Sequence, residues 1–327
     1  MNIAIKVIYN VALLFIMMIP GVLLVKFNMS VKGFGKGLSN LVLYIAQPAL
    51  IFMAYLRPYN EEILKNSLYV FVLSVIVHIM FSVVAMLCFK KSPDGIRRML
   101  RFATIFSNAA FMGIPLIAAV LEDSYPGATV YASIYNITFN LFLWSLGVYI
   151  CTDKRDRDND GVDDGVEEIK ENASPLKALY HPVTIAATIG LIFFIFSLEA
   201  YVPALITESL NMLKGLVAPL SMVVIGLRLA DMDFRGVLKD KDMFVFLFLR
   251  HVLLPLLTVG LIKLVDLIIP VAPVVQTVVV IMASAPAATS ATMFAEKYDC
   301  DAAYVSRLVT VSTLLSIATM PLVLLLV

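Results

Sequence analysis

The sequence predicts an all-α integral membrane protein with ten transmembrane helices, arranged as two inverted repeats of five. Three observations lead to this prediction. Of the 327 residues, 61% are hydrophobic and the mean hydropathy is +0.92, whereas soluble domains are roughly 45–50% apolar. The apolar residues gather in ten segments, five on each side of one polar stretch. Similar residues also recur in the two halves at a nearly constant offset.

Each of the ten segments is long enough to cross a bilayer, whose core of about 30 Å needs roughly 20 apolar residues per helix. The predicted spans are residues 4–25, 37–56, 66–89, 99–121, 127–150, 176–197, 205–230, 243–267, 272–296 and 302–326. The first repeat is therefore placed at 1–151 and the second at 176–327, with an acidic loop at 152–175 between them.

Charge placement predicts the orientation. Most of the 25 Lys and Arg residues lie in the loops after segments 1, 3, 5, 7 and 9, whereas several alternate loops carry Glu or Asp, as at Glu61, Glu122 and Glu199. Basic loops stay in the cytoplasm. We therefore expect a multi-pass protein of the cell (inner) membrane, with both termini outside and the central loop cytoplasmic.

Pairs of residues relate the two halves. Pro48 and Pro219 lie at matching places, and an Arg follows each of them nine residues later; further pairs are His78 and His251, Gly113 and Pro286, Tyr131 and Tyr304, and Ser133 and Ser306. Because five spans is an odd number, the two copies must be inverted in the membrane. Inverted repeats are typical of secondary transporters, whose sites lie at the repeat interface.

Two predicted spans carry residues that interrupt a helix, at 107–115 and at 284–290. Pro115 and Pro286 lack an N–H, so the carbonyls four residues before them lose their helical partners. Such breaks create half-helices whose amino ends can bind anions. The alternative is that the Pro and Gly residues only kink or pack helices. The candidate substrate-binding residues are Ser107, Asn108, Gly113, Pro115, Ser284, Pro286, Thr289 and Ser290.

Three amides in other spans are further candidates. Asn136 and Asn140 are four residues apart and share one helical face, and Gln47 directly precedes Pro48. Each can bind substrate or form an interhelical hydrogen bond. His78 can relay protons or be a packing histidine.

The absence of acidic residues from the middle of every span favours an anionic substrate, since carriers of cations place carboxylates there. The unpaired ionisable residues within the membrane are instead basic or neutral: His78, His251, Arg250 and Lys263. No Gly-x-Ser-x-Gly, His-Glu-x-x-His or paired intramembrane Asp is present, so we do not expect an enzyme. The three cysteines are too scattered for a metal cluster or disulfide framework. We expect no cofactor, no metal and no nucleic-acid partner.

The central loop contains a match to the calcium-loop template, from Asp156 to Glu167. Asp163 occupies a position that is usually apolar, and flanking EF-hand helices are not evident. A solvated acidic linker is the preferred interpretation, and calcium binding remains an open hypothesis.

The residues resemble the auxin efflux carrier family, which includes plant PIN auxin exporters and bacterial malate-permease-like proteins. The resemblance is carried by Asn108-Ala-Ala-Phe-Met-Gly-Ile-Pro-Leu, Tyr131-Ala-Ser-Ile-Tyr-Asn, Asn140-Leu-Phe-Leu-Trp144, Pro219 to Arg228, and Ser284 to Tyr298. The central loop is far shorter than in long plant PIN proteins, so a prokaryotic carrier is the better match.

This resemblance implies a fold related to bile-acid sodium symporters and NhaA, in which broken helices 4 and 9 cross. Spans 1, 2, 6 and 7 would form a scaffold, and spans 3–5 and 8–10 a transport domain that moves as an elevator. It also implies a homodimer through the scaffold and a small organic carboxylate as substrate, auxin-like or malate-like, with Asn108 and the two crossing prolines in the site. An anion channel or a membrane-embedded ligand sensor on the same fold is the alternative.

Overall fold

The computed structural model describes residues 3–31, 33–152, 175–230 and 240–326. These residues form helices and one isolated β-bridge, with no strand of a sheet among them. The predicted calcium loop, Asp156–Glu167, lies outside the described residues.

The helices follow one another in two sets. The first set consists of α1 (Ile3–Ile16), α2 (Ile19–Lys26), α3 (Phe34–Leu41), η1 (Val42–Ala46), α4 (Gln47–Tyr55), α5 (Glu61–Leu87), α6 (Asp94–Ile105), η2 (Ala109–Gly113), α7 (Ile114–Val120), α8 (Ala128–Phe142), η3 (Leu143–Gly147) and α9 (Val148–Thr152). The second set consists of η4 (Pro175–Tyr180), α10 (Pro182–Ile195), η5 (Glu199–Tyr201), α11 (Ala204–Gly215), α12 (Val217–Ala230), α13 (Lys241–Phe248), η7 (Leu249–Leu253), α14 (Leu254–Asp266), α15 (Pro273–Ser284), α16 (Ser290–Lys297) and α17 (Ala302–Leu324).

Seven helical segments are long and apolar enough to cross a membrane, and together they make this a multi-pass membrane protein. They are Tyr9–Lys26, Phe34–Tyr55, Glu61–Leu87, Ala128–Thr152, Ala204–Ala230, Lys241–Asp266 and Ala302–Leu324. Three apolar helices are shorter, at Ala109–Val120, Pro182–Ile195 and Pro273–Ser284. Two of the three are parts of the spans predicted to be broken.

Helix starts follow ordinary capping chemistry. The Asn60 side chain accepts hydrogen bonds from Glu62 N and Ile63 N at the start of α5. Asp240 does the same for α13, and Asp301 accepts from Tyr304 N at the start of α17. Capping of this kind satisfies amide groups that have no partner within the helix.

Glycines let two pairs of helices touch closely. A Cβ on Gly21 of α2 would lie 2.2 Å from Val223 O, and a Cβ on Gly226 of α12 would lie 2.1 Å from Met18 O. A Cβ on Gly190 of α10 would lie 2.9 Å from the Tyr55 Cβ of α4. Small residues at helix crossings bring backbones together and increase packing in lipid. Predicted spans 1 and 7, and spans 2 and 6, are thus in close contact.

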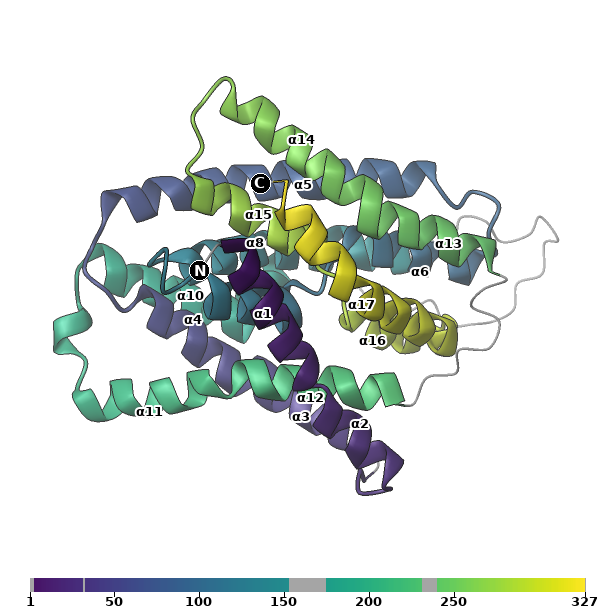
Figure 1. Cartoon of the computed structure of the whole chain (residues 1–327), viewed down its shortest axis with the longest axis horizontal. Coiled ribbons are helices and arrows are strands. Elements are labelled where there is room, and N and C mark those ends of the chain that lie inside the picture. Colours follow the sequence, from purple (N-terminus) through teal and green to yellow (C-terminus); the bar gives the residue numbers. More distant parts are fainter. Residues whose placement is uncertain (1–2, 32, 153–174, 231–239, 327) are drawn as a thin grey trace.

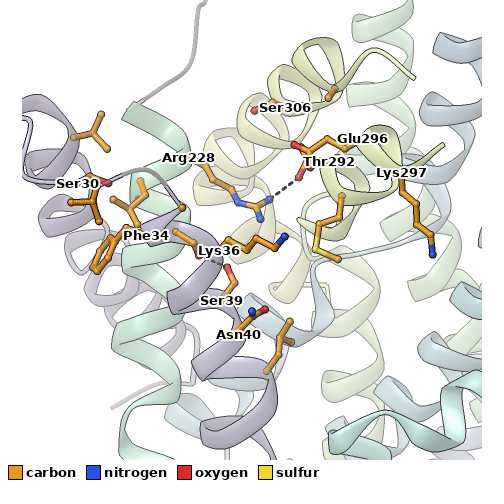
Figure 2. Close-up of a pocket in the computed structure, with 18 of the residues that line it drawn as sticks. Ser30, Phe34, Lys36, Ser39, Asn40, Arg228, Thr292, Glu296, Lys297 and Ser306 are labelled. Atoms are coloured by element: carbon orange, nitrogen blue, oxygen red, sulfur yellow. Dashed lines mark hydrogen bonds between the residues drawn. The ribbon is translucent and has the colours of Figure 1, made fainter. Parts of the chain in front are cut away.

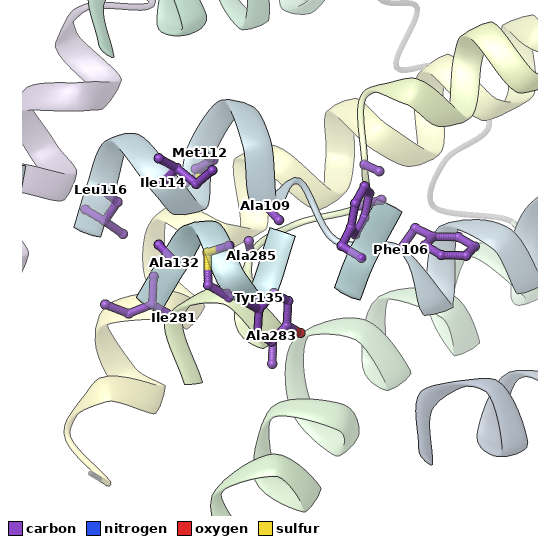
Figure 3. Close-up of a cluster of buried hydrophobic side chains, with 14 of the residues drawn as sticks. Phe106, Ala109, Met112, Ile114, Leu116, Ala132, Tyr135, Ile281, Ala283 and Ala285 are labelled. Atoms are coloured by element: carbon purple, nitrogen blue, oxygen red, sulfur yellow. The ribbon is translucent and has the colours of Figure 1, made fainter. Parts of the chain in front are cut away.

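The arrangement places the broken helices in the interior. Figure 1 shows α8, α15 and α6 between α5 on one side and the α11–α12 segment on the other. Around the breaks, the side chains of Phe106, Ala109, Met112, Ile281 and Ala285 gather in one buried cluster (Figure 3). The junction between the two breaks is therefore enclosed by apolar side chains.

Candidate functional site

The two interrupted helices meet at their breaks. Between α6 and η2 the chain is extended at Phe106, and between α15 and α16 it is extended at Ala285. Ser107 and Ala287 form an antiparallel bridge. Asn108 N donates to Pro286 O at 2.7 Å, and Ala288 N donates to Phe106 O at 2.9 Å. Each break thus supplies the backbone partners that the other lost, as a buried backbone requires.

The causes of the two breaks differ. Pro286 removes an amide hydrogen and drives Ala285 into an extended conformation, with φ −58° and ψ 149°. The first interruption covers Phe106–Asn108 and contains no proline. Pro115 does not cause it, contrary to the expectation from sequence, because Pro115 lies in the first turn of α7, which continues directly from η2.

The turn before Pro115 is a π-helix. Asn108 O accepts hydrogen bonds from Met112 N at 3.0 Å and Gly113 N at 3.1 Å. Gly113 is a packing residue here, since a Cβ at this position would lie 2.6 Å from the Met282 Sδ of α15. π-turns accommodate an irregular hydrogen-bond pattern without ending the helix and are frequent at functional sites.

Several buried polar atoms around the breaks have no hydrogen-bond partner. They are Ser107 Oγ, Asn108 Nδ2 and Ser284 Oγ, all on side chains that are at most 3% exposed. A buried polar group without a partner costs about 1–3 kcal/mol. A bound ligand or an ordered water is one way in which such a cluster of groups is satisfied.

The second break contributes fewer unpaired groups. Thr289 Oγ1 lies 3.5 Å from Asn108 Oδ1, at the limit of a hydrogen bond. Ser290 is half-buried and begins α16. No side chain caps the first turn of α16 or of η2, although Ala291 N in that turn of α16 donates to Ala288 O at 3.0 Å.

The three further amides are also buried. Gln47 Nε2 donates to Ala110 O, which joins α4 to η2, while Gln47 Oε1 has no partner. Asn136 and Asn140 lie in α8, which packs against α15 and η2, and Asn136 Oδ1 and Asn140 Nδ2 have no partner. The substrate and packing interpretations therefore both remain for the asparagines, whereas Gln47 has at least a packing role.

The intramembrane histidines have structural partners. His78 Nδ1 lies 2.7 Å from Ser74 O, and its ring is stacked on Phe142. His251 Nε2 lies 2.9 Å from Ser312 Oγ, which accepts a hydrogen bond from Ala287 N. His251 thus supports the second break through Ser312, a link with no sequence signature.

The two cations among the intramembrane residues, Arg250 and Lys263, lie in different surroundings. The Lys263 side chain is exposed on α14. Arg250 is fully buried and its guanidinium donates to backbone carbonyls of both broken helices. The sequence shows that Arg250 lies within a span but does not show its hydrogen-bond partners.

A cavity of about 1130 Å³ lies beside the site and opens between α2–α3 and α12, α16 and α17. Figure 2 shows Lys36, Arg228, Glu296 and Lys297 around it. Arg228 Nη1 donates to Thr289 O at 2.7 Å and to Thr292 Oγ1 at 2.9 Å. Arg228 on the wall of the cavity is therefore hydrogen-bonded to the second break, and the cavity has more basic than acidic lining residues.

An ion pair lies at the opposite end of the molecule, where Arg57 lines a second pocket of about 550 Å³. Arg57 Nη2 lies 2.7 Å from Glu122 Oε1, and the Glu122 carboxylate also accepts from Gly127 N and Thr129 N. Burial works to raise the pKa of Glu122, but the hydrogen bonds from Gly127, Thr129 and Arg57 outweigh it and hold that pKa below its usual value. Arg57 and Arg228 are repeat-related in the sequence.

Apolar membrane-crossing helices around a pair of hydrogen-bonded breaks define a polytopic membrane transport protein. Residues 6–324 match the family model described as "Membrane transport protein". The chain belongs to this family, that of the auxin efflux carriers, which confirms the resemblance noted in the sequence. The family is one of transporters rather than enzymes.

One curated relative is the "Uncharacterized transporter MJ1031" of Methanocaldococcus jannaschii. The two sequences are 25% identical over 199 residues, which is 60% of this chain and 60% of the relative. The alignment thus spans less than two thirds of the relative's length.

Proposed function

We propose that the protein is a secondary active transporter of small organic anions, and that the carboxylate of the substrate binds between the two breaks. The observation that carries this proposal is the group of buried, unpartnered side chains at the junction, among them Ser107 Oγ, Asn108 Nδ2 and Ser284 Oγ. A carboxylate can accept hydrogen bonds from such donors and from the uncapped amino ends of the half-helices. Auxin-like monocarboxylates and malate-like dicarboxylates are the substrate classes.

The topology belongs to the same proposal. Ten spans form two inverted repeats, with helices 4 and 9 crossing at the breaks. The basic loops face the cytoplasm of a cell (inner) membrane, so the large cavity opens inward and the Arg57–Glu122 pair lies on the outer side.

In the proposed elevator motion, spans 3–5 and 8–10 slide against a scaffold of spans 1, 2, 6 and 7. The glycine contacts between α2 and α12 and between α4 and α10 favour a rigid scaffold. Polar contacts join it to the other spans, as from Arg57 to Glu122 and from Arg228 to Thr289. The Arg57 and Glu122 side chains are 22% and 23% exposed, so water can take the place of this contact during transport.

A homodimer through the scaffold is supported by α11, which buries none of its residues although it lies in a membrane-crossing segment. The helix carries Glu208, Asn211 and Lys214. Polar side chains facing lipid are costly, and a second copy would cover them.

The test uses proteoliposomes and Asn108→Ala. Uptake of radiolabelled indole-3-acetate and malate is measured with and without the same anion trapped inside. We expect wild-type exchange of at least one probe, and a fall of at least ~10-fold in Asn108→Ala, about 1.4 kcal/mol of lost binding. Thr277→Ala is the control and should be unaffected, because Thr277 lies in the first turns of α15, away from the junction, and its hydroxyl donates to Pro273 O of the same helix.

The outcomes separate the alternatives. An anion channel dissipates a gradient without accelerating exchange, and a ligand sensor binds a probe without moving it. Wild-type exchange by a well-expressed Asn108→Ala would show that the anion site lies elsewhere.

A further inference from the structure

Arg250 joins the carboxyl ends of the two broken helices. Its Nε and Nη2 donate to Ala285 O at 3.0 and 2.5 Å, and Nη2 also donates to Ala283 O at 2.9 Å. Its Nη1 donates to Thr104 O at 3.1 Å. Thr104 lies in the last turn of α6, and Ala283 and Ala285 lie at the end of α15. A single side chain therefore caps both half-helices.

The partners of this guanidinium are all backbone carbonyls. The side chain is 0% exposed and packs over the ring of Phe81, whose centroid is 5.5 Å from Cζ. No acidic side chain is among the hydrogen-bond partners found for it in the described part of the chain. An arginine remains charged in proteins, and a buried charge must be compensated. Here the compensation comes from helix carbonyls.

The carboxyl end of a helix carries about −0.5 of an elementary charge. Two such ends placed together form a site for one positive charge. In carriers with discontinuous helices, the carbonyls of half-helix ends coordinate Na⁺, and a sodium ion is what a fold related to sodium symporters implies. In this protein the carbonyls of residues 104, 283 and 285 already receive the guanidinium. A sodium ion does not fit the same set.

The amino ends of the half-helices at the junction, unlike the carboxyl ends, have no side chain that caps them. The helix Ala109–Val120 and α16 begin there without a side-chain cap. Asn108 Nδ2, on a side chain that is 2% exposed, is unpartnered beside the first of them. Neutralising the carboxyl ends leaves the partial positive charges of the amino ends uncancelled.

We propose that Arg250 is a built-in cation that takes the place of a coupling sodium ion at the junction and gives it a net positive charge. As a positioning residue, it keeps both carboxyl ends together and leaves both amino ends free for an anion. This inference rests on the proposed anion site for its functional meaning, but the cation replacement itself is testable without a substrate.

The first experiment uses the wild-type protein in detergent. Thermal unfolding is recorded in NaCl and in choline chloride at equal ionic strength, and binding of ²²Na⁺ is measured by scintillation proximity. We expect the same Tm in both salts and no saturable ²²Na⁺ binding. A saturable rise of Tm with Na⁺, or stoichiometric ²²Na⁺ binding, would overturn the proposal.

The second experiment replaces the side chain. Arg250→Ala should lower Tm, and low-millimolar methylguanidinium should restore part of the loss in a saturable manner that the wild type does not show. Arg57→Ala, which removes an arginine from a partly exposed ion pair, is the control and should not respond. A folded Arg250→Ala that responds neither to methylguanidinium nor to Na⁺ contradicts the proposal.

Arg250→Lys keeps the charge and covers the case in which Arg250→Ala does not fold. We expect a folded protein whose Tm is insensitive to Na⁺. Sodium-dependent stability in Arg250→Lys would contradict the proposal. The Na⁺ and methylguanidinium measurements can give the expected results while no carboxylate is transported or bound. In that case the proposed transport of anions is wrong, and the proposed role of Arg250 still stands.

Discussion

Asn108 joins two segments that are 181 residues apart in the sequence. Its backbone N–H is bonded to Pro286, its carbonyl to Met112 and Gly113, and its side chain faces Thr289. The sequence predicted this residue because a polar amide beside a helix break is unusual in lipid. It could not predict the role of Arg250, since the partners of that side chain are backbone carbonyls and leave no residue pattern.

The Glu122 carboxylate makes the stability of the folded protein depend on pH. Because its pKa is lowered in the folded protein, its stabilising contribution is present above the unfolded pKa, about 4.3, and is lost as the pH falls through the folded value. Glu122→Gln should therefore lower Tm at pH 7, and the difference from the wild type should shrink below about pH 4.

Thermal unfolding at pH 7 and at pH 3.5 checks this. A Tm difference that is the same at both pH values would mean that the ionised carboxylate does not stabilise the fold.

Proline explains only one of the two helix interruptions. Pro286 lies at its break, as predicted. Pro115 lies in the first turn of α7, and the first interruption at Phe106–Asn108 forms because the second break provides its hydrogen-bond partners. A contact between distant segments overrides local helix propensity here, so the sequence predicted an interruption at 107–115 but not its cause.

The close contact between α2 and α12 predicts that a larger residue at Gly226 destabilises the protein. Gly226→Ala should lower stability by about 1–3 kcal/mol because the new Cβ would collide with the Met18 carbonyl, and backbone atoms cannot move aside as a side chain can. Gly260→Ala is the matched control. Nothing lies within 4 Å of a Cβ at Gly260 in α14, so replacing this helical glycine should be neutral or stabilising.

Melting temperatures of both variants in the same detergent decide the matter. Equal Tm values for the two alanine variants would show that the helices can separate without cost.

For the whole molecule, seven of the ten predicted segments coincide with helices long enough to cross a membrane, and the other three contain shorter apolar helices. The nearly constant offset between the halves remains the basis for the predicted inverted repeat. The cavity between α2–α3 and α16–α17 was not predicted, because its shape depends on how segments far apart in the sequence pack together.

The elevator proposal predicts that tethering the scaffold to the moving part stops transport. Arg57 and Glu122 are both partly exposed and lie on opposite sides of the proposed boundary. With Cys88, Cys151 and Cys300 replaced by serine, Arg57→Cys and Glu122→Cys are combined and treated with a bis-methanethiosulfonate of matching reach. Uptake should stop and should return after reduction.

The two single-cysteine variants, treated in the same way, control for simple modification. Undiminished uptake by the fully cross-linked protein would contradict motion across this boundary.

The buried guanidinium of Arg250 also has an electrical consequence. If its helix moves across the membrane field, the empty carrier transports one positive charge, and a potential of 100 mV acts on each elementary charge with about 2.3 kcal/mol. A bound monocarboxylate cancels that charge, and a dicarboxylate reverses it. The membrane voltage would then govern the return of the empty carrier, while the passage of a monoanion would be electrically silent.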